Sequence, residues 1–208
     1  MDTTGVIQLV TILVLVGLSA FFSSAETAFT TVNRVRMKAL ADEGNSRASA
    51  VLTVLDHYSK MLSTILIGNN IVNLTASSLT TILASKVFGS YAVGIATGIL
   101  TLTILIFGEI IPKNTAMIYS DKISLIYAKI ILFLMKIFTP VVFIIDRLSM
   151  GISRLLHIDM SKKGSVMTEN ELKTYVDVSH EDGVIESEER EIIYNIFDFS
   201  DAVAKDIM

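Results

Sequence analysis

Residues 6–25, VIQLVTILVLVGLSAFFSSA, form an uncharged run that decides the class of fold. A bilayer core about 30 Å thick is crossed by roughly 20 apolar residues in a helix. Two similar segments follow, and we expect membrane spans at about residues 6–32, 61–86 and 88–112. A cleaved signal peptide is disfavoured because the residues before the first run carry no basic group. The sequence therefore predicts an all-α membrane protein with three transmembrane helices.

Charge divides the chain into two parts. Residues 1–167 hold 14 basic and 9 acidic residues, a net charge of +5, whereas residues 168–208 hold 3 and 12, a net charge of −9. We expect a transmembrane domain over residues 1–160 and a cytoplasmic acidic helical bundle over residues 165–208. Basic residues interspersed with apolar runs, and the absence of Trp, give no case for nucleic-acid binding. The absence of Cys excludes disulfides, zinc–thiolate sites and cysteine nucleophiles.

Basic residues also set the expected orientation. None precedes the first span, whereas the segment between the first two spans contains five, namely Arg34, Arg36, Lys38, Arg47 and Lys60. Since cytoplasmic loops carry the excess of Lys and Arg, we expect this segment and the C-terminus inside, and the N-terminus outside. Within it, residues 35–41 and 47–57 are predicted to form a cytoplasmic short-helix pair, broken at Asp42-Glu43-Gly44-Asn45. These features are typical of a multi-pass protein of the cell membrane.

Residues 121–156 allow two interpretations. Hydropathy alone would add a fourth span here and place the acidic tail outside. Lys122, Lys129 and Lys136 recur every seven residues, so they form one stripe on an otherwise apolar helix. We therefore favour an interfacial belt helix in contact with membrane lipid, broken or kinked at Thr139-Pro140.

The acidic segment is predicted to contain two helices. Thr168 and Glu171 form a capping box that opens the first, Gly183 ends it, and the second begins near Ser187. The second helix carries an apolar stripe, formed by Ile192, Ile193, Ile196 and Phe197, that needs a partner surface. Since about 40 residues rarely hold a core alone, we expect either a longer protein or a tail that dimerises.

Three polar clusters lie within the expected spans, where polarity is costly. They are residues 21–27, FFSSAET; residues 67–73, IGNNIVN; and residues 107–113, FGEIIPK. Each cluster has a structural alternative. In the first, the hydroxyls bond to their own helix, and Glu26 lies at the interface or pairs with a basic residue. In the second, the asparagines bond between helices, and in the third, Glu109 forms a salt bridge with Lys113.

Together the clusters offer hydroxyl, amide, carbonyl and carboxylate oxygens, the ligands that Mg²⁺ and Ca²⁺ prefer. No His lies within the expected spans to activate a serine, which disfavours an intramembrane hydrolase, and we expect no enzyme. One or two carboxylates leave a divalent ion incompletely neutralised, which suits release and transport better than permanent binding.

The three motifs, in this order, resemble those of the CNNM/CorC family of magnesium transporters. The matching stretches are residues 22–28, 66–73 and 107–113, and residues 183–191 resemble the acidic bundle that precedes a CBS-domain pair in that family. The resemblance implies a homodimer with one cytoplasm-facing Mg²⁺ site per subunit, and a CBS-domain pair that these 208 residues lack. Motif positions and the expected carbonyl ligands place this metal site at Ser23, Ser24, Gly68, Asn69, Asn70, Asn73, Gly108 and Glu109.

Two functions of different class follow. The first is a Mg²⁺ transporter in which Glu109 supplies the charge and neutral oxygens complete the site; the resemblance implies export, with Na⁺ as a candidate exchanged ion. The second is a membrane-anchored Mg²⁺ sensor or regulatory scaffold that transports nothing itself. In that alternative, divalent ions screen the repulsion among the twelve carboxylates of residues 168–208 and let the apolar stripes meet.

Overall fold

A computed structural model describes residues 3–89, 91–155, 169–181 and 183–201 of the chain. The described residues form helices and contain no strand, which confirms the all-α prediction for this part of the chain. The elements are α1 (Thr3–Thr31), α2 (Arg34–Asp42), α3 (Ser46–Asp56), α4 (Tyr58–Phe88), α5 (Ala92–Thr103), the π-helix η1 (Ile104–Ile110), α6 (Ile111–Ile118), α7 (Ser120–Ile137), α8 (Thr139–Leu155), α9 (Glu169–Glu181) and α10 (Ser187–Asp201). The chain divides into two units, Met1–Leu148 and Ser149–Met208.

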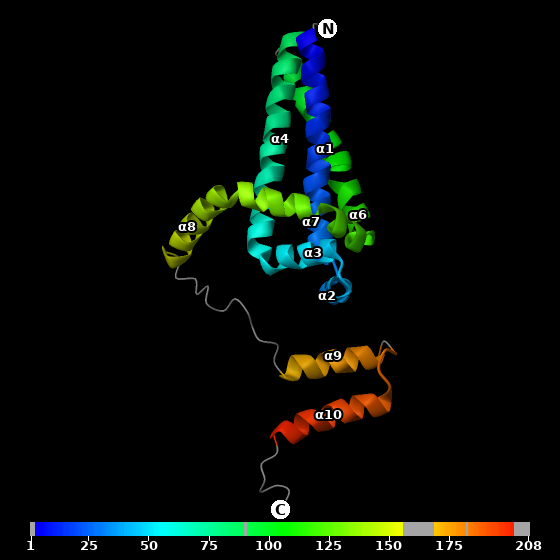
Figure 1. Cartoon of the computed structure of the whole chain (residues 1–208). Coiled ribbons are helices and arrows are strands. Elements are labelled where there is room, and N and C mark those ends of the chain that lie inside the picture. Colours follow the sequence, from blue (N-terminus) through cyan, green and yellow to red (C-terminus); the bar gives the residue numbers. More distant parts are fainter. Residues whose placement is uncertain (1–2, 90, 156–168, 182, 202–208) are drawn as a thin grey trace, which may run out of the picture. The chain divides into compact units, whose positions relative to one another are not determined.

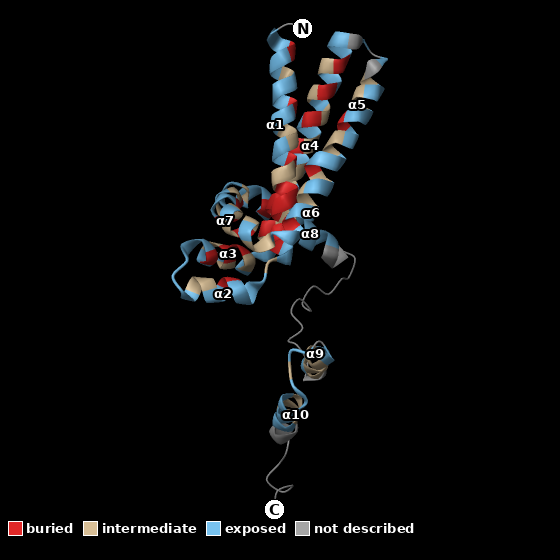
Figure 2. Ribbon diagram, turned by 90° about the vertical axis from the view of Figure 1, so that its right-hand side faces the viewer, coloured by how far each residue is buried: buried red, intermediate tan, exposed pale blue. Residues whose placement is uncertain are grey.

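In the first unit, α1 and α4 lie side by side and run in opposite directions (Figure 1). The core lies where these two helices meet α3 and α7, and Phe29, Met61, Ile65 and Ile131 are almost fully buried there. Figure 2 shows that towards the N-terminal end of α1 the helices are largely exposed. The exposed side chains there are mainly aliphatic, which is the surface expected where lipid is the solvent.

Two continuous helices have the length and composition of a membrane span: α1 and the helix Val93–Ile118, which joins α5, η1 and α6. α7 and α8 meet at a bend of 67° and add a third candidate only if they form one broken span. The predicted span at residues 61–86 falls within α4, which has 31 residues. Its Ser, Thr and Asn side chains make α4 less apolar than a typical span, so its crossing of the membrane stays a prediction.

The predicted short-helix pair is present as α2 and α3. The side chain of Asn33 accepts a hydrogen bond from the N–H of Arg36, and Asn45 caps α3 in the same way. Gly44 takes a φ of +92° in the turn between the helices, a conformation that favours glycine. Arg36 then donates to Asp121 over 2.8 Å, so the pair is tied to α7.

α7 lies across α1 and α4 and packs on α3 (Figure 1). Its buried side includes Ala128 and Ile131, whereas the three lysines of the predicted stripe are exposed. The belt predicted over residues 121–156 consists of two helices that meet at Phe138, next to the break or kink expected at Thr139-Pro140. Pro140 lies at the second residue of α8, where its missing N–H has no helical partner to lose.

The second unit contains α9 and α10, which pack on each other. Asp177 of α9 accepts hydrogen bonds from Arg190 over 2.7 Å and from Tyr194 over 2.8 Å, both on α10. Gly183 has a φ of +72° in the turn between the helices, as the predicted helix end requires. The predicted capping box at Thr168 and Glu171 lies outside the described side chains.

Candidate polar site between the long helices

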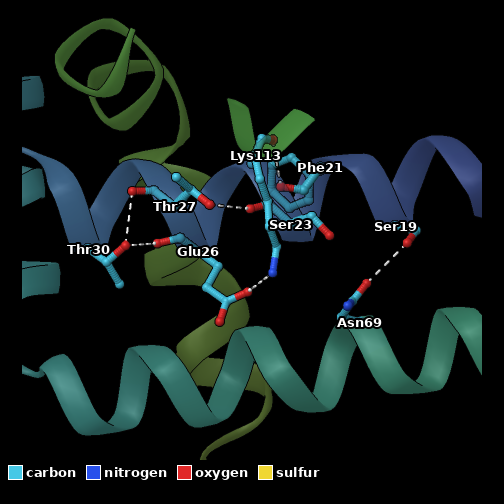
Figure 3. Close-up of polar contacts among 9 residues, drawn as sticks. Ser19, Phe21, Ser23, Glu26, Thr27, Thr30, Asn69 and Lys113 are labelled. Atoms are coloured by element: carbon cyan, nitrogen blue, oxygen red, sulfur yellow. Dashed lines mark hydrogen bonds and ion pairs between the residues drawn. The ribbon is translucent and has the colours of Figure 1, made fainter. Parts of the chain in front are cut away.

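Two serines of α1, Ser19 and Ser23, are fully buried one helical turn apart. Ser19 donates a hydrogen bond to the side-chain oxygen of Asn69 on α4, over 3.2 Å (Figure 3). The hydroxyl of Ser23 has no hydrogen-bond partner among the described residues. Since an unpaired buried hydroxyl costs about 1–3 kcal/mol, a polar ligand at Ser23 would recover that cost.

Two glycines bring the helices close to these serines. A side chain at Gly68 would overlap the ring of Phe22, so α4 approaches α1 closely only because position 68 has no Cβ. A Cβ at Gly108 would lie 3.0 Å from the hydroxyl oxygen of Ser19. The buried serine of α1 therefore lies between Asn69 of α4 and the backbone of η1.

The backbone around Gly108 departs from α-helical geometry. η1 is a π-helix, and the N–H of Ile111 at its end bonds to the carbonyl of Ile106, five residues earlier. Pro112 has no N–H to donate to the carbonyl of Gly108, which would be its partner in an α-helix. Short π-helical segments occur frequently at functional sites, and this one carries Glu109.

Glu109 lines a pocket of about 280 Å³ between α4 and the α5–η1 helix. Asn70 and Asn73 line the same pocket, together with Ser77 and Thr101. The side-chain oxygen of Asn73 is buried and has no hydrogen-bond partner among the described residues. The pocket is therefore lined by one carboxylate and by amide and hydroxyl side chains, which are hard oxygen donors of the kind that a cation prefers.

The basic residue four positions after Glu109 pairs elsewhere. Lys113 lies 3.2 Å from a carboxylate oxygen of Glu26 on α1 (Figure 3), and among the described residues Glu109 makes no ion pair. The salt-bridge alternative for Glu109 is therefore not observed, whereas Glu26 does pair with a base. In the described part of the chain, no three His, Asp or Glu side chains lie close enough together to hold a metal ion. Glu109 is the one acidic residue among those that line this pocket, so the pocket has a single carboxylate.

The structure brings together only part of the predicted set. Asn70, Asn73 and Glu109 share the pocket, while Asn69 turns to α1. The hydroxyl of Ser24 donates to the carbonyl of Phe21 in its own helix, and Ser24 lines a separate pocket with Pro112. Ser23 lines neither pocket.

Sequence reasoning missed Ser19, although it lies four residues before Ser23 and therefore on the same helix face. It also missed Ser77, four residues after Asn73, and Thr101 on the facing helix. A search for hydroxyls at helical spacing from the quoted motifs would have found the two serines. The position of Thr101 depends on how α5 packs against α4, and no local pattern indicates that.

Long apolar helices enclosing a polar pocket define a helical membrane domain. The family described as "Cyclin M transmembrane N-terminal domain", CNNM, matches residues 9–189. The chain therefore belongs to the CNNM family, which confirms the resemblance seen in the motifs.

Three curated relatives are similar to nine tenths or more of this chain. The UPF0053 inner membrane protein YfjD of Escherichia coli is 33% identical over 193 residues, which are 92% of this chain and 44% of YfjD. A UPF0053 protein of Haemophilus influenzae is 31% identical over 191 residues, 92% of this chain and 45% of its own. A third relative, from the same organism and named polyamine export protein, is 28% identical over 204 residues, 90% of this chain and 47% of its own. The chain thus spans less than half the length of these three relatives.

Proposed function

We propose that this chain is the membrane domain of a Mg²⁺ transporter, and that Glu109 supplies the charge that attracts the ion. The observation that carries the proposal is the pocket lined by this carboxylate, which makes no ion pair among the described residues, and by Asn73, whose buried side-chain oxygen has no hydrogen-bond partner among them. Mg²⁺ takes oxygen ligands and keeps several of its waters, usually with only one or two carboxylates. A pocket of about 280 Å³ exceeds many-fold the ~10–15 Å³ that one water requires.

Neighbouring groups add neutral oxygens in this proposal. The Ser23 hydroxyl and the Asn69 amide lie on the facing sides of α1 and α4, and Gly108 offers a carbonyl that lacks its α-helical donor. Because a single carboxylate leaves Mg²⁺ with a net positive charge, binding is weak enough for release. The proposed arrangement has three spans, α1, α4 and α5–α6, with the N-terminus outside and α7 as the interfacial belt. Assembly as a homodimer, and export in exchange for Na⁺, extend the proposal from the family resemblance.

The direct test is Mg²⁺ flux into liposomes that contain this chain, followed with an internal Mg²⁺-sensitive dye. We expect Glu109→Gln to reduce the flux at least about tenfold, because the variant keeps the shape of the side chain and removes its charge. Glu43→Gln, a matched change in the exposed turn after α2, should transport like the wild type. Undiminished flux in Glu109→Gln would contradict the assignment of this residue.

The sensor or scaffold alternative predicts a different pattern. Mg²⁺ would raise the thermal stability of the chain through the carboxylates of residues 168–208, so Glu109→Gln would keep that rise, and neither protein would carry flux. Flux and the Mg²⁺-dependent stability, measured together on wild type and Glu109→Gln, therefore distinguish the two functions.

A second candidate cargo is an organic polycation. The observation that favours it is the name of the Haemophilus influenzae relative, polyamine export protein. The pocket wall also contains aliphatic side chains, including Leu100 and Leu105, which suit the methylene groups of a polyamine. Flux of spermidine and of Mg²⁺, measured separately in the same liposomes, identifies the cargo, and both cations should depend on Glu109.

A further inference from the structure

A second polar pocket lies where α3 ends, α4 begins and α7 ends. Its volume is about 180 Å³, and its polar lining consists of Thr53, His57, Lys60, Lys136 and Thr139. Three of these side chains are basic and none is acidic. The pocket is separate from the one that holds Glu109, and the transport proposal gives it no role.

The basic groups of this pocket are available to an anion. Neither Lys60 nor Lys136 makes an ion pair with another residue that the structure describes, and Asp56, the nearest acid in sequence, pairs with Arg34. The Nδ1 atom of His57 lies 3.0 Å from the carbonyl of Thr53. Assigning the proton to Nδ1 on this contact leaves Nε2 unused by that bond.

The start of α4 borders the same pocket. His57 caps this 31-residue helix without a side-chain hydrogen bond. The N–H groups of the first turn have no partners within the helix, and they carry the positive end of its dipole. Lys60 lies in this first turn and lines the pocket, while the C-terminal ends of α3 and α7 lie at the same pocket and oppose the dipole of α4, so the net positive charge of the pocket comes from its basic side chains.

The last two turns of α7 separate this basic pocket from an apolar groove. Leu134 and Phe138 line the groove, which has no polar lining atoms, whereas Lys136 and Thr139 line the basic pocket. Within α7, Leu134 and Lys136 are two residues apart, about 200° at 100° per residue, so they lie on roughly opposite faces of the helix. A helix that is apolar on one side and cationic on the other is suited to the level of lipid headgroups.

We propose that the basic pocket binds the phosphate of an anionic phospholipid headgroup. The two lysines attract the negative charge and can donate to phosphate oxygens, whereas the hydroxyls of Thr53 and Thr139 donate to the carbonyls of Ser49 and Met135 in their own helices. A zwitterionic choline headgroup would bring its own cation against the lysines, so the pocket favours lipids with a net negative charge. Bound there, the lipid would link α3, α4 and the junction between α7 and α8.

The test measures thermal unfolding of the purified chain in neutral detergent with added phosphatidylglycerol, phosphatidylcholine or inorganic phosphate. We expect phosphatidylglycerol to raise the melting temperature, with phosphatidylcholine and inorganic phosphate at equal concentration having little effect. Lys60→Gln/Lys136→Gln should weaken the apparent affinity for phosphatidylglycerol by about 10- to 30-fold. Lys136→Arg, which keeps the charge, should retain the shift.

The matched control is Lys122→Gln/Lys129→Gln, which removes the same charge from exposed positions of α7 outside the pocket. It should respond to phosphatidylglycerol like the wild type. Equal loss in both double variants would overturn the proposal, because it would show attraction to the basic surface as a whole. An equal shift with inorganic phosphate would overturn the lipid assignment in favour of a free phosphate. Circular dichroism of each variant before lipid addition establishes that the helices are intact.

Discussion

Lys113 and Glu26 form an ion pair between α6 and α1, with 3.2 Å between the ammonium nitrogen and a carboxylate oxygen. The two residues are far apart in sequence, so the pair fixes a tertiary contact. It also engages the basic residue that lies one helical turn after Glu109. Lys113 is therefore engaged by α1, and Glu109 makes no ion pair among the residues that the structure describes.

The first prediction concerns the energy of this pair. Its side chains are partly exposed, at 41% for Lys113 and 28% for Glu26, so we expect a coupling of only about 0.5–1 kcal/mol. Thermal unfolding of Glu26→Gln, Lys113→Gln and the double variant gives this coupling as a double-mutant cycle. The exposed pair of Arg34 and Asp56 is the control and should give a smaller value. A coupling of zero for Glu26 and Lys113 would show that their contact does not stabilise the fold.

The second prediction concerns the close approach at Gly68. Gly68→Ala should destabilise the chain by about 1–3 kcal/mol, because the new methyl group would overlap the ring of Phe22. Thermal unfolding in detergent measures the effect. Gly17→Ala is the control, because a Cβ there meets no atom within 4 Å, and it should not lower stability.

A compensating variant shows whether the clash is the cause. Phe22→Leu shortens the side chain that fills the space at Gly68, so Gly68→Ala should cost less in that background. If Gly68→Ala costs the same in both backgrounds, its effect arises elsewhere in α4.

The third prediction separates stability from binding at Ser23. Its hydroxyl is buried without a partner among the described residues, so Ser23→Ala should leave the melting temperature without Mg²⁺ unchanged or raise it. If the hydroxyl binds the ion, the rise in melting temperature on adding Mg²⁺ should become smaller. Ser78→Ala, whose exposed hydroxyl donates to its own helix, should change neither value. A marked loss of stability without Mg²⁺ would assign the Ser23 hydroxyl a structural role instead.

The fourth prediction concerns pH and the pair α9–α10. Hydrogen bonds from Arg190 and then Tyr194 hold the pKa of Asp177 below its ordinary value. A carboxyl whose folded pKa is lowered stabilises the fold at neutral pH, and that stabilisation is lost as the pH falls through the folded pKa. Hydrogen exchange of the full chain should show weaker protection of α9 and α10 in Asp177→Asn than in wild type at pH 7. At a pH well below the folded pKa of Asp177 the two proteins should exchange alike, and a difference that persists there would contradict this origin.

Local patterns predicted the local features of this chain. The break before Thr139-Pro140 follows from the chemistry of proline, and the turn at Gly44 follows from a glycine that adopts a positive φ and an asparagine that caps the next helix. Gly183 likewise predicted the end of α9. In each case the determining residues lie within one helical turn of the feature.

The composition of the site was less predictable, because it depends on which helix faces which. The three asparagines lie within five residues, but Asn69 contacts α1 while Asn70 and Asn73 face the α5–η1 helix. Helical spacing indicates that Asn69 and Asn73 lie on the same face of α4. It does not indicate which neighbouring helix each of them contacts. The pairing of Lys113 with Glu26 is a contact of the same kind.

The π-helix that carries Glu109 also constrains the length of the chain. Its hydrogen bonds close five residues apart, so it holds one more residue than an α-helix would between the same contacts. Deleting one residue from Ile104–Ile110 would let the helix return to α geometry while α5 and α6 keep their present neighbours. The same deletion within α5 or α6, which have no extra residue to lose, would turn the two ends of the helix relative to each other by about 100°. The π-helix is therefore the one part of Val93–Ile118 where a residue can be removed without turning Thr101 away from Lys113.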